Sequence, residues 1–324
     1  MKVQRCLFHG NPRVWYRQST IVARSNTLNT RQHPRFTSTA NPLYRYKSLQ
    51  TLKNVNIEQF RENHFSPERP VIFPHGQFRN LPAFERWFQF PQSESNASRL
   101  NTAYLKQHGA EALVPLELTQ PSSESGENEI NFRQFHAPLG LFLQWMRTAE
   151  EQPQPTRLYL AQCQLLDLPQ VLRDDFPTPD LVLQTGKGDV YDTNVWIGYP
   201  PTYTPLHRDP NPNLFVQFAG RKTVRLLGPN DGQALFASVR RQLGKSGNRE
   251  AAAIRGEDMM QGRERILLEE AVWGDKVDTT SPGHRSIGYE AHLEAGDGMF
   301  IPKGWWHSIK GVGEGVTASV NWWF

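Results

Sequence analysis

Short apolar runs flanked by Pro and Gly recur along the chain, and each run has the length and composition of a β-strand. The strands predicted in this way are residues 70–73, 113–118, 157–165, 190–198, 296–302 and 317–324. The stretch HRDPNPNLFVQFAGRKTVRLLG, residues 207–228, has the pattern of a β-hairpin that turns at Ala219-Gly220. Many short strands separated by turn signals predict a mainly β fold, a sandwich or barrel of the jelly-roll type.

Helical periodicity is restricted to a few segments. Apolar residues at helical spacing predict helices at 81–89 and 137–151, and a short helix at 168–175. The polar segment 120–129 is a predicted loop. The charged stretch 230–285, which contains RERILLEEAV, predicts a helical insertion between strands. Because the sequence shows no internal repeat and no interdomain linker, we expect one domain over 58–324. In this domain, additional helices and strands precede the β core.

The positive charge of the chain is confined to its amino-terminal segment. The formal net charge is +4, but the first acidic residue is Glu58, and 10 Lys and Arg residues precede it. The remainder has 26 basic and 32 acidic residues, a net charge of −6. A basic segment without acids, rich in Arg, Ser, Thr and Asn, is typical of a mitochondrial transit peptide. We therefore expect a transit-peptide-like tail at 1–57; an attached disordered basic arm, with a nuclear or cytoplasmic location, is the alternative.

The cysteine content and the length of the apolar runs argue against a disulfide-stabilised fold, a thiolate zinc site and a membrane-spanning helix. The two cysteines are Cys6, which lies in the tail, and Cys163. One cysteine outside the tail allows neither an internal disulfide nor a thiolate zinc site there. No apolar run approaches the roughly 20 residues that a membrane-spanning helix needs, so we expect no membrane insertion.

One lysine falls on a predicted buried face. On the strand that ends the 207–228 stretch, side chains alternate, so Lys222 shares a face with Val224 and Leu226. Burying an ammonium group costs free energy unless an anion meets it. A dicarboxylic cosubstrate would provide that anion.

A histidine and an aspartate lie two residues apart at the start of the same stretch. On a strand, His207 and Asp209 project to one side, and an imidazole with a carboxylate forms two thirds of a 2-His-1-carboxylate iron site. The third ligand must come from a neighbouring strand, and His307 in FIPKGWWH is the best candidate. His-x-Asp alone is common on surface loops; its combination with His307 and Lys222 favours a metal site.

With these residues the sequence resembles the JmjC-domain 2-oxoglutarate/Fe(II) oxygenases of the cupin superfamily, especially their small single-domain hydroxylases. The resemblance covers about residues 58–324, in the motifs PVIF, VPLEL, LYLAQ, TPLHRDPNPNLFVQFAGRK, EAGDGMFIPKGWWH and SVNWWF. It implies a double-stranded β-helix, with Fe(II) held by His207, Asp209 and His307, and with 2-oxoglutarate and O2 as cosubstrates. The cosubstrate lysine of the family, thirteen residues after the aspartate, corresponds to Lys222.

The same resemblance implies four further residues of the cosubstrate site. Thr204 and Tyr159 match groups that bind the distal carboxylate of 2-oxoglutarate. Asn213 matches a polar residue that lines the pocket, and Asn321 on the last strand is carried over with it. Structural alternatives stay open for three of them. Thr204 could be a hydroxyl in a turn, Tyr159 a packed aromatic ring and Asn213 a turn cap.

The resemblance implies hydroxylation of a protein side chain or an RNA base, with CO2 and succinate as co-products. The net charge of −6 outside the tail slightly disfavours RNA. A JmjC lysine demethylase and a non-enzymatic cupin-like binding protein are the alternatives. The sequence shows no histone-reading, zinc or DNA-binding module, and it leaves a homodimer open.

The distance between the metal ligands departs from compact members of the family. Asp209 and His307 are 98 residues apart, and the stretch 230–285 supplies the extra length. We expect this insertion beside the mouth of the site, where it would influence substrate choice. The substrate of a relative therefore cannot be transferred to this chain.

Overall fold

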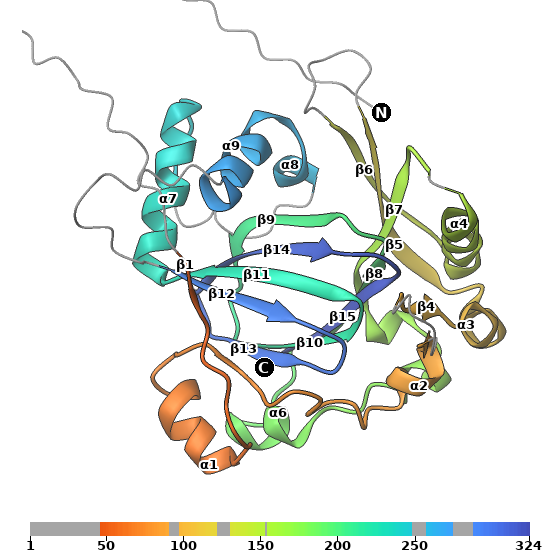
Figure 1. The fold of residues 1–324 in the computed structure, drawn as a ribbon, viewed down its shortest axis with the longest axis horizontal. Coiled ribbons are helices and arrows are strands. Elements are labelled where there is room, and N and C mark those ends of the chain that lie inside the picture. Colours follow the sequence, from red (N-terminus) through yellow and green to blue (C-terminus); the bar gives the residue numbers. More distant parts are fainter. Residues whose placement is uncertain (1–45, 91–96, 122–129, 153, 248–256, 275–287) are drawn as a thin grey trace, which may run out of the picture. The chain divides into compact units, whose positions relative to one another are not determined.

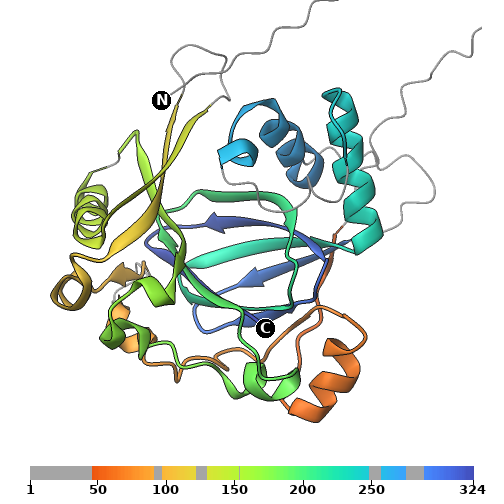
Figure 2. The same cartoon turned by 180° about the vertical axis from the view of Figure 1, so that it is seen from behind.

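Two β-sheets face one another at the centre of the computed structural model, and helices lie around them (Figures 1 and 2). The structure describes residues 46–90, 97–121, 130–152, 154–247, 257–274 and 288–324. None of the helices in these ranges is both long enough and apolar enough to cross a membrane.

The strands fall into a smaller and a larger sheet. The smaller sheet has the order β1 (Tyr46–Ser48), β12 (Gly288–Leu293), β11 (Arg221–Leu227), β14 (Trp306–Val312), β9 (Thr202–Arg208). The larger sheet has the order β2 (Val71–Ile72), β13 (Gly298–Ile301), β10 (Asn213–Ala219), β15 (Thr317–Trp323), β8 (Asp192–Gly198), β7 (Arg157–Gln164), β5 (Leu113–Pro121), β6 (Ile130–Pro138). A separate pair joins β3 (Phe88–Gln89) and β4 (Arg99–Leu100). The strands from β8 to β15 divide equally between the two sheets, which confirms the mainly β, double-stranded β-helix prediction.

The predicted hairpin at 207–228 is wrong in its strand pairing. The strand β10 pairs with β13 and β15, whereas β11 pairs with β12 and β14. The chain turns at Gly220, where φ is +63° and a Cβ would lie 2.5 Å from the carbonyl oxygen of Val316. The turn signal was therefore correct, but the chain crosses at this glycine from one sheet to the facing one.

Helices occupy the connections between strands. Their bounds are α1 (Ile57–Phe60), the π-helical η1 (Arg61–Phe65), α2 (Ala83–Trp87), α3 (Thr102–Gly109), α4 (Leu139–Glu151), the 3₁₀ helix η2 (Leu165–Asp167), α5 (Gln170–Arg173), α6 (Asp180–Thr185), α7 (Pro229–Gln242), α8 (Glu257–Met260) and α9 (Gly262–Trp273). The predicted helices at 81–89, 137–151 and 168–175 correspond to α2, α4 and α5. Each begins directly after a proline, namely Pro82, Pro138 and Pro169. Of the predicted loop 120–129, residues 120 and 121 belong to β5 and the rest lies outside the described residues.

Apolar packing occurs on both sides of each sheet. Between the sheets, Phe215, Val224 and Leu226 belong to one buried cluster. A larger cluster joins the outer face of the larger sheet to the helices α2–α6. On the outer face of the smaller sheet, Phe236 of α7 and Leu268 of α9 belong to a third cluster. Because both outer faces are covered, the space between the sheets is the interior of the molecule.

The folded part of the chain begins before residue 58. Residues 46–48, which charge alone assigned to the tail, form β1 and pair with β12. Leu49 follows in the core with 7% of its surface exposed. The absence of acids up to residue 57 therefore does not mark the structural boundary. Of the predicted tail at 1–57, residues 1–45 lie outside the described residues.

The stretch 230–285 contributes α7, α8 and α9, and its residues 248–256 and 275–287 lie outside the described residues. Helix α9 contacts α7 and β9, and α8 contacts β9 and β6. These helices therefore lie beside β9, the strand that carries His207 (Figure 1).

Candidate metal and cosubstrate site

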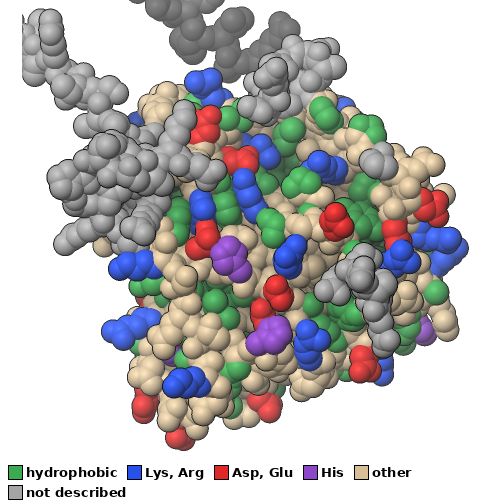
Figure 3. Space-filling view, viewed as in Figure 1, with side chains coloured by type: hydrophobic (Ala, Val, Ile, Leu, Met, Phe, Trp, Pro, Cys, Tyr) green, Lys and Arg blue, Asp and Glu red, His purple; other side chains and the backbone are tan. Residues whose placement is uncertain are grey.

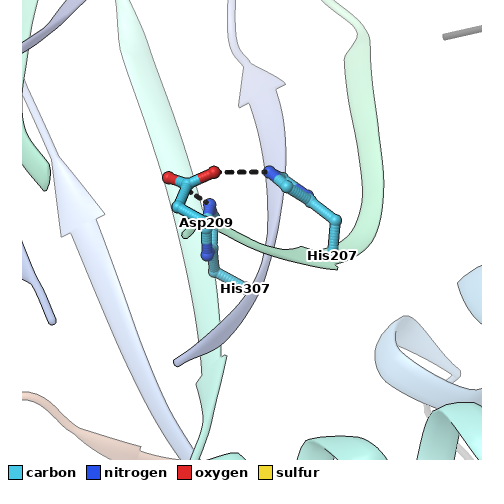
Figure 4. Close-up of side chains that lie close together, drawn as sticks. All are labelled: His207, Asp209 and His307. Atoms are coloured by element: carbon cyan, nitrogen blue, oxygen red, sulfur yellow. Dashed lines mark ion pairs between the residues drawn. The ribbon is translucent and has the colours of Figure 1, made fainter. Parts of the chain in front are cut away.

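His207, Asp209 and His307 meet between the two sheets. His207 lies near the end of β9 and His307 near the start of β14, directly opposite one another in the strand pair. Their ring centroids are 4.2 Å apart, and Asp209 follows the end of β9. All three side chains are at least 96% buried, and one ligand atom from each lies within 4.8 Å of the others (Figure 4).

An irregularity in β9 places His207. Thr204 pairs with Ile309 and His207 with His307, so β9 has one residue more than β14 over this interval. Both Thr204 and His207 line the same cavity, although plain alternation would send residues three apart to opposite faces. Such bulges re-aim side chains at active sites.

Both imidazoles present a free nitrogen to the carboxylate. The Nδ1–H of His207 donates to the carbonyl of Pro205 (2.8 Å), and that of His307 donates to the carbonyl of Trp305 (3.2 Å). Their Nε2 atoms lie 3.9 and 3.7 Å from oxygens of Asp209 (Figure 4). Burial, reinforced by the neighbouring His307, lowers the pKa of His207 to about 4. A neutral imidazole oriented through Nδ1 is the form that binds a metal, so this donor set fits one divalent cation.

Lys222 lies in the same cavity as these residues. It is 3% exposed, and its ammonium donates to the Ser319 hydroxyl (2.6 Å) and the Tyr159 hydroxyl (3.3 Å). Burial lowers the pKa of Lys222 to about 7. Among the described residues, no acidic side chain forms an ion pair with it. One buried cavity thus contains a His-Asp-His cluster that could hold a metal ion. Elsewhere its wall contains Lys222, which forms no ion pair with an acidic side chain of the described residues. This combination suits a dicarboxylate that also chelates a metal.

The structure brings seven of the eight predicted site residues to this cavity. They are Tyr159, Thr204, His207, Asp209, Lys222, His307 and Asn321. The exception is Asn213, which is 1% exposed. Its amide donates to Asp209 (2.9 Å) and its oxygen accepts from Asn321 (2.9 Å). Asn213 is not among the residues that line this cavity, and its side chain orients Asp209 instead.

Comparison with known protein families decides where the chain belongs. A family model described as a cupin-like domain matches residues 57–324. The chain belongs to the cupin-like domain family. This agrees with the double-stranded β-helix and with the position of the His-Asp-His cluster between its sheets.

Curated relatives of this cupin-like domain bear JmjC and demethylase names. It is 26% identical to "Lysine-specific demethylase JMJ30" of Arabidopsis thaliana, over 86% of the chain and 55% of the relative. It is 27% identical to "Lysine-specific demethylase 8" of Danio rerio, over 86% and 58%, and 24% identical to "Jumonji C domain-containing protein 5" of Drosophila melanogaster, over 88% and 63%. These names confirm the resemblance to the JmjC oxygenases, and the chain spans just over half the length of these relatives.

Sequence reasoning missed six residues that line the cavity of the cupin-like domain, namely Trp196, Thr202, Phe215, Ile309, Ser319 and Trp323. Ser319 accepts from Lys222, and the indole of Trp323 donates to Asp209 (3.1 Å). Both share a face of β15 with Asn321, so alternation along SVNWWF could have found them. Trp196 also lines the cavity. Nothing in the sequence around Trp196 separates this ring from an aromatic residue of the core.

We expect replacement of Asn213 by alanine to weaken metal binding about 10–100-fold, the usual effect of losing a group that orients a ligand. Calorimetric titration with Mn(II) measures this. Gln217→Ala is the matched control, because Gln217 is buried on the same strand and its side-chain amide donates to Ala219 and Thr317 rather than to Asp209. Equal Mn(II) affinities of the two variants would contradict the orienting role of Asn213.

A second, larger cavity adjoins the first at its Lys222 end. It has a volume of about 580 Å³ and shares Tyr159 and Thr202 with the first cavity, and Thr202 pairs with Gly311, which also pairs with Lys222. Arg265 and Ile266 of α9 form one wall of this second cavity. Glu117 of β5 also lines the second cavity, and burial raises the pKa of its carboxyl to about 7.

Proposed function

We propose that this cupin-like domain is an Fe(II)- and 2-oxoglutarate-dependent oxygenase that hydroxylates a protein side chain or an RNA base. The observation that carries the proposal is one buried cavity with two complementary features. It contains a His-Asp-His cluster with both Nε2 atoms turned toward the carboxylate, and it contains Lys222 without an anionic partner. A scaffold without catalysis has no need for this costly combination of buried charges.

Each group of the site has a defined task. His207, Asp209 and His307 would hold Fe(II), and Asn213 and Trp323 keep the carboxylate oriented through their hydrogen bonds. When bound, Fe(II) supplies the redox chemistry that couples 2-oxoglutarate decarboxylation to oxygen insertion into a C–H bond.

The far carboxylate of 2-oxoglutarate is the natural partner of Lys222. The hydroxyls of Tyr159 and Ser319 already contact its ammonium, and Thr204 lines the same cavity. These groups orient the cosubstrate, and the buried walls exclude water from it. In a water-poor site a charge-assisted contact of this kind is strong.

A demethylase is the second candidate, because two of the three relatives named above carry that name. Hydroxylation of an N-methyl group gives an unstable product that releases formaldehyde, whereas hydroxylation of carbon gives a stable product. Formaldehyde release during turnover therefore distinguishes the two outcomes.

Mass spectrometry of cellular protein and RNA tests the proposed function. Cells with the wild-type chain should contain a modification with the mass of one oxygen atom that cells with Asp209→Ala lack. Purified wild-type chain should also convert 2-oxoglutarate to succinate. Absence of both the modification and succinate formation would overturn the proposal.

Cosubstrate affinity should fall as pH rises above about 7. Lys222 has a folded-state pKa of about 7 before the cosubstrate binds, so above this pH a proton must be taken up with the dianion. By linkage, the Kd of 2-oxoglutarate should rise up to about tenfold per pH unit until the pKa of the complex is reached. Anaerobic titration of the Mn(II)-loaded chain across this range measures the slope. Lys222→Arg is the control, because its guanidinium stays charged and should show a flatter dependence; equal slopes would contradict this account.

We also propose that the basic segment before Glu58 directs the chain to mitochondria. Its 10 basic and zero acidic residues support this. Cell fractionation followed by amino-terminal sequencing is the test, with a shortened chain expected in the mitochondrial fraction. Recovery of the chain with Met1 intact from the nuclear or cytosolic fraction would overturn it.

A further inference from the structure

The bulge in β9 sets the direction of two groups in the cavity between the sheets. From Thr204 to His207 this strand has one residue more than β14, and both side chains line the cavity. Within the bulge, the carbonyl of Pro205 accepts from Nδ1 of His207 (2.8 Å). A change in the geometry of the bulge would therefore move a residue of the cosubstrate site and a metal ligand together.

Ser308 holds this bulge from the neighbouring strand. It lies between His307 and Ile309, the residues of β14 that pair with His207 and Thr204. Its side chain is fully buried, and its hydroxyl donates to the carbonyl of Thr204 (2.8 Å). A bulge interrupts the regular ladder of main-chain hydrogen bonds, and this serine supplies a partner for one of the carbonyls concerned.

Helix α9 of the insertion orients the hydroxyl of Ser308. The indole N–H of Trp273, the last residue of α9, donates to the oxygen of Ser308 (2.8 Å). Because this oxygen accepts the indole proton, the hydroxyl hydrogen is left to point toward Thr204. Two hydrogen bonds in series thus lead from the insertion to the wall of the cavity, and we call this chain of three residues the relay.

Apolar packing joins the insertion to the same bulge. The side chain of Leu206, which lies within the bulge, is 2% exposed. It belongs to the apolar cluster on the outer face of the smaller sheet, together with Leu268 and Val272 of α9. Helix α9 therefore contacts the bulge through the relay and through this cluster.

The end of α9 that carries Trp273 is fixed to the smaller sheet. The guanidinium of Arg225, on β11, donates to the carbonyl of Val272 (2.7 Å) and lies 4.5 Å from the centroid of the Trp273 ring. The ammonium of Lys310, on β14, lies 5.0 Å from the same ring. Two cations against one indole hold the ring in place, so its N–H stays directed at Ser308.

Ion pairs also join α9 to the sheet, but they are a weaker argument. The ammonium of Lys310 pairs with Glu269 of α9 (2.7 Å), and these side chains are 28% and 32% exposed. Pairs in contact with water contribute little to stability. Figure 3 shows basic and acidic side chains interspersed over the face that it displays, so charges of both signs are common on the surface. The relay and the packing of Leu206 are the contacts that single out this helix.

We propose that Trp273 is a positioning residue of the cavity: through Ser308 it fixes the bulge of β9, and thereby the directions of Thr204 and His207. This inference rests on the proposed function and gives the insertion a task in metal and cosubstrate binding. Trp273 itself is not among the residues that line the cavity, so it acts through β9.

Trp273→Phe tests the relay with little change in packing. Phenylalanine keeps a ring for Arg225 and Lys310 but has no N–H for Ser308. In anaerobic titrations of the full chain, loss of this hydrogen bond should raise the Kd of Mn(II) and the Kd of 2-oxoglutarate each about threefold to tenfold. Trp87→Phe is the matched control, because the indole of Trp87 also donates a hydrogen bond of 2.8 Å, to Asp175, and lies outside the cavity. Its two Kd values should stay within about twofold of wild type.

A double-mutant cycle separates the relay from two unrelated structural effects. Ser308→Ala removes both the acceptor of the Trp273 indole and the donor to Thr204. In the Ser308→Ala background, Trp273→Phe should therefore change the two Kd values by less than about twofold. Substitutions that act independently would instead multiply their effects. Wild-type Kd values in Trp273→Phe, or multiplied effects in the double variant, would overturn the proposal.

Hydrogen exchange measures the bulge without metal or cosubstrate. In the ligand-free chain, the amides of β9 should exchange about threefold to tenfold faster in Trp273→Phe than in wild type, and at the wild-type rate in Trp87→Phe. Unchanged exchange in β9 of Trp273→Phe would overturn the proposal. Faster exchange in this variant, combined with a wild type that binds no 2-oxoglutarate, would overturn the proposed function but support the link from Trp273 to β9.

Discussion

Asp209→Asn should abolish metal-dependent turnover while the fold persists. The asparagine oxygen can still accept from Asn213 and Trp323, which both donate to one carboxylate oxygen, so these donors stay paired. The negative charge that faces both Nε2 atoms is lost, and an amide nitrogen takes the second position. Losing a group that only orients a ligand already costs 10–100-fold in metal affinity, so losing the anionic ligand should cost more than about 100-fold.

Two readouts separate this effect from unfolding. Mn(II) at a hundredfold excess over its wild-type Kd should stabilise the wild type by about 2.7 kcal/mol, and the variant should gain less than about 0.4 kcal/mol at the same concentration. Without metal the two melting curves should be similar. Asp297→Asn is the control, because Asp297 is a buried carboxylate that contacts His75 outside the cavity. Full succinate formation by Asp209→Asn in metal-controlled buffer would contradict the assignment.

Lys222→Ala should fail mainly in cosubstrate binding. Removing one partner of a buried charge pair costs about 2–5 kcal/mol, because the other charge stays buried and unpaired. At about 1.4 kcal/mol per tenfold, the Kd of 2-oxoglutarate should rise roughly thirty- to several-thousand-fold. The effect should be largest below pH 7, where the lysine is charged before binding. Lys222→Arg should recover only part of the loss, because a planar guanidinium does not match a site shaped for an ammonium.

Anaerobic titration of Mn(II)-loaded variants decides this point. Lys310→Ala is the control, because Lys310 lies on the neighbouring strand but pairs with Glu269 (2.7 Å) rather than with the cavity. Mn(II) affinity should change little in either variant, since the three ligands are intact. If 2-oxoglutarate binds to Lys222→Ala within threefold of wild type, Lys222 is not the carboxylate anchor.

Local alternation was enough to predict the chemistry of single strands. The period of two placed Lys222 with Val224 and Leu226 on a buried face, and all three are buried in the structure. The same rule placed His207 and Asp209 together, although Asp209 lies just past the end of β9. These features depend only on the order of neighbouring residues along one strand, so they can be predicted from the sequence.

Features that depend on strands far apart in the chain could not be derived in the same way. The turn at Gly220 suggested a hairpin, but the residues of β10 and β11 pair with residues 61 to 110 positions further along the chain. Asn213 was expected to line the pocket. In the structure its amide donates to Asp209 and its oxygen accepts from Asn321 of β15, a contact between residues 108 positions apart. The bulge in β9 is likewise visible only against β14. The family resemblance, rather than periodicity, supplied Thr204 and Tyr159.

The central claim is that one metal and one 2-oxoglutarate share the cavity between the sheets, and calorimetry tests it most directly. The full chain is titrated without oxygen, first with Mn(II) and then with 2-oxoglutarate, and separately with 2-oxoglutarate in the absence of metal. We predict one Mn(II) per chain, then one 2-oxoglutarate per chain, with cosubstrate binding at least about tenfold weaker when metal is absent. Binding of 2-oxoglutarate that is equally tight with and without metal, or no binding of Mn(II), would contradict the account.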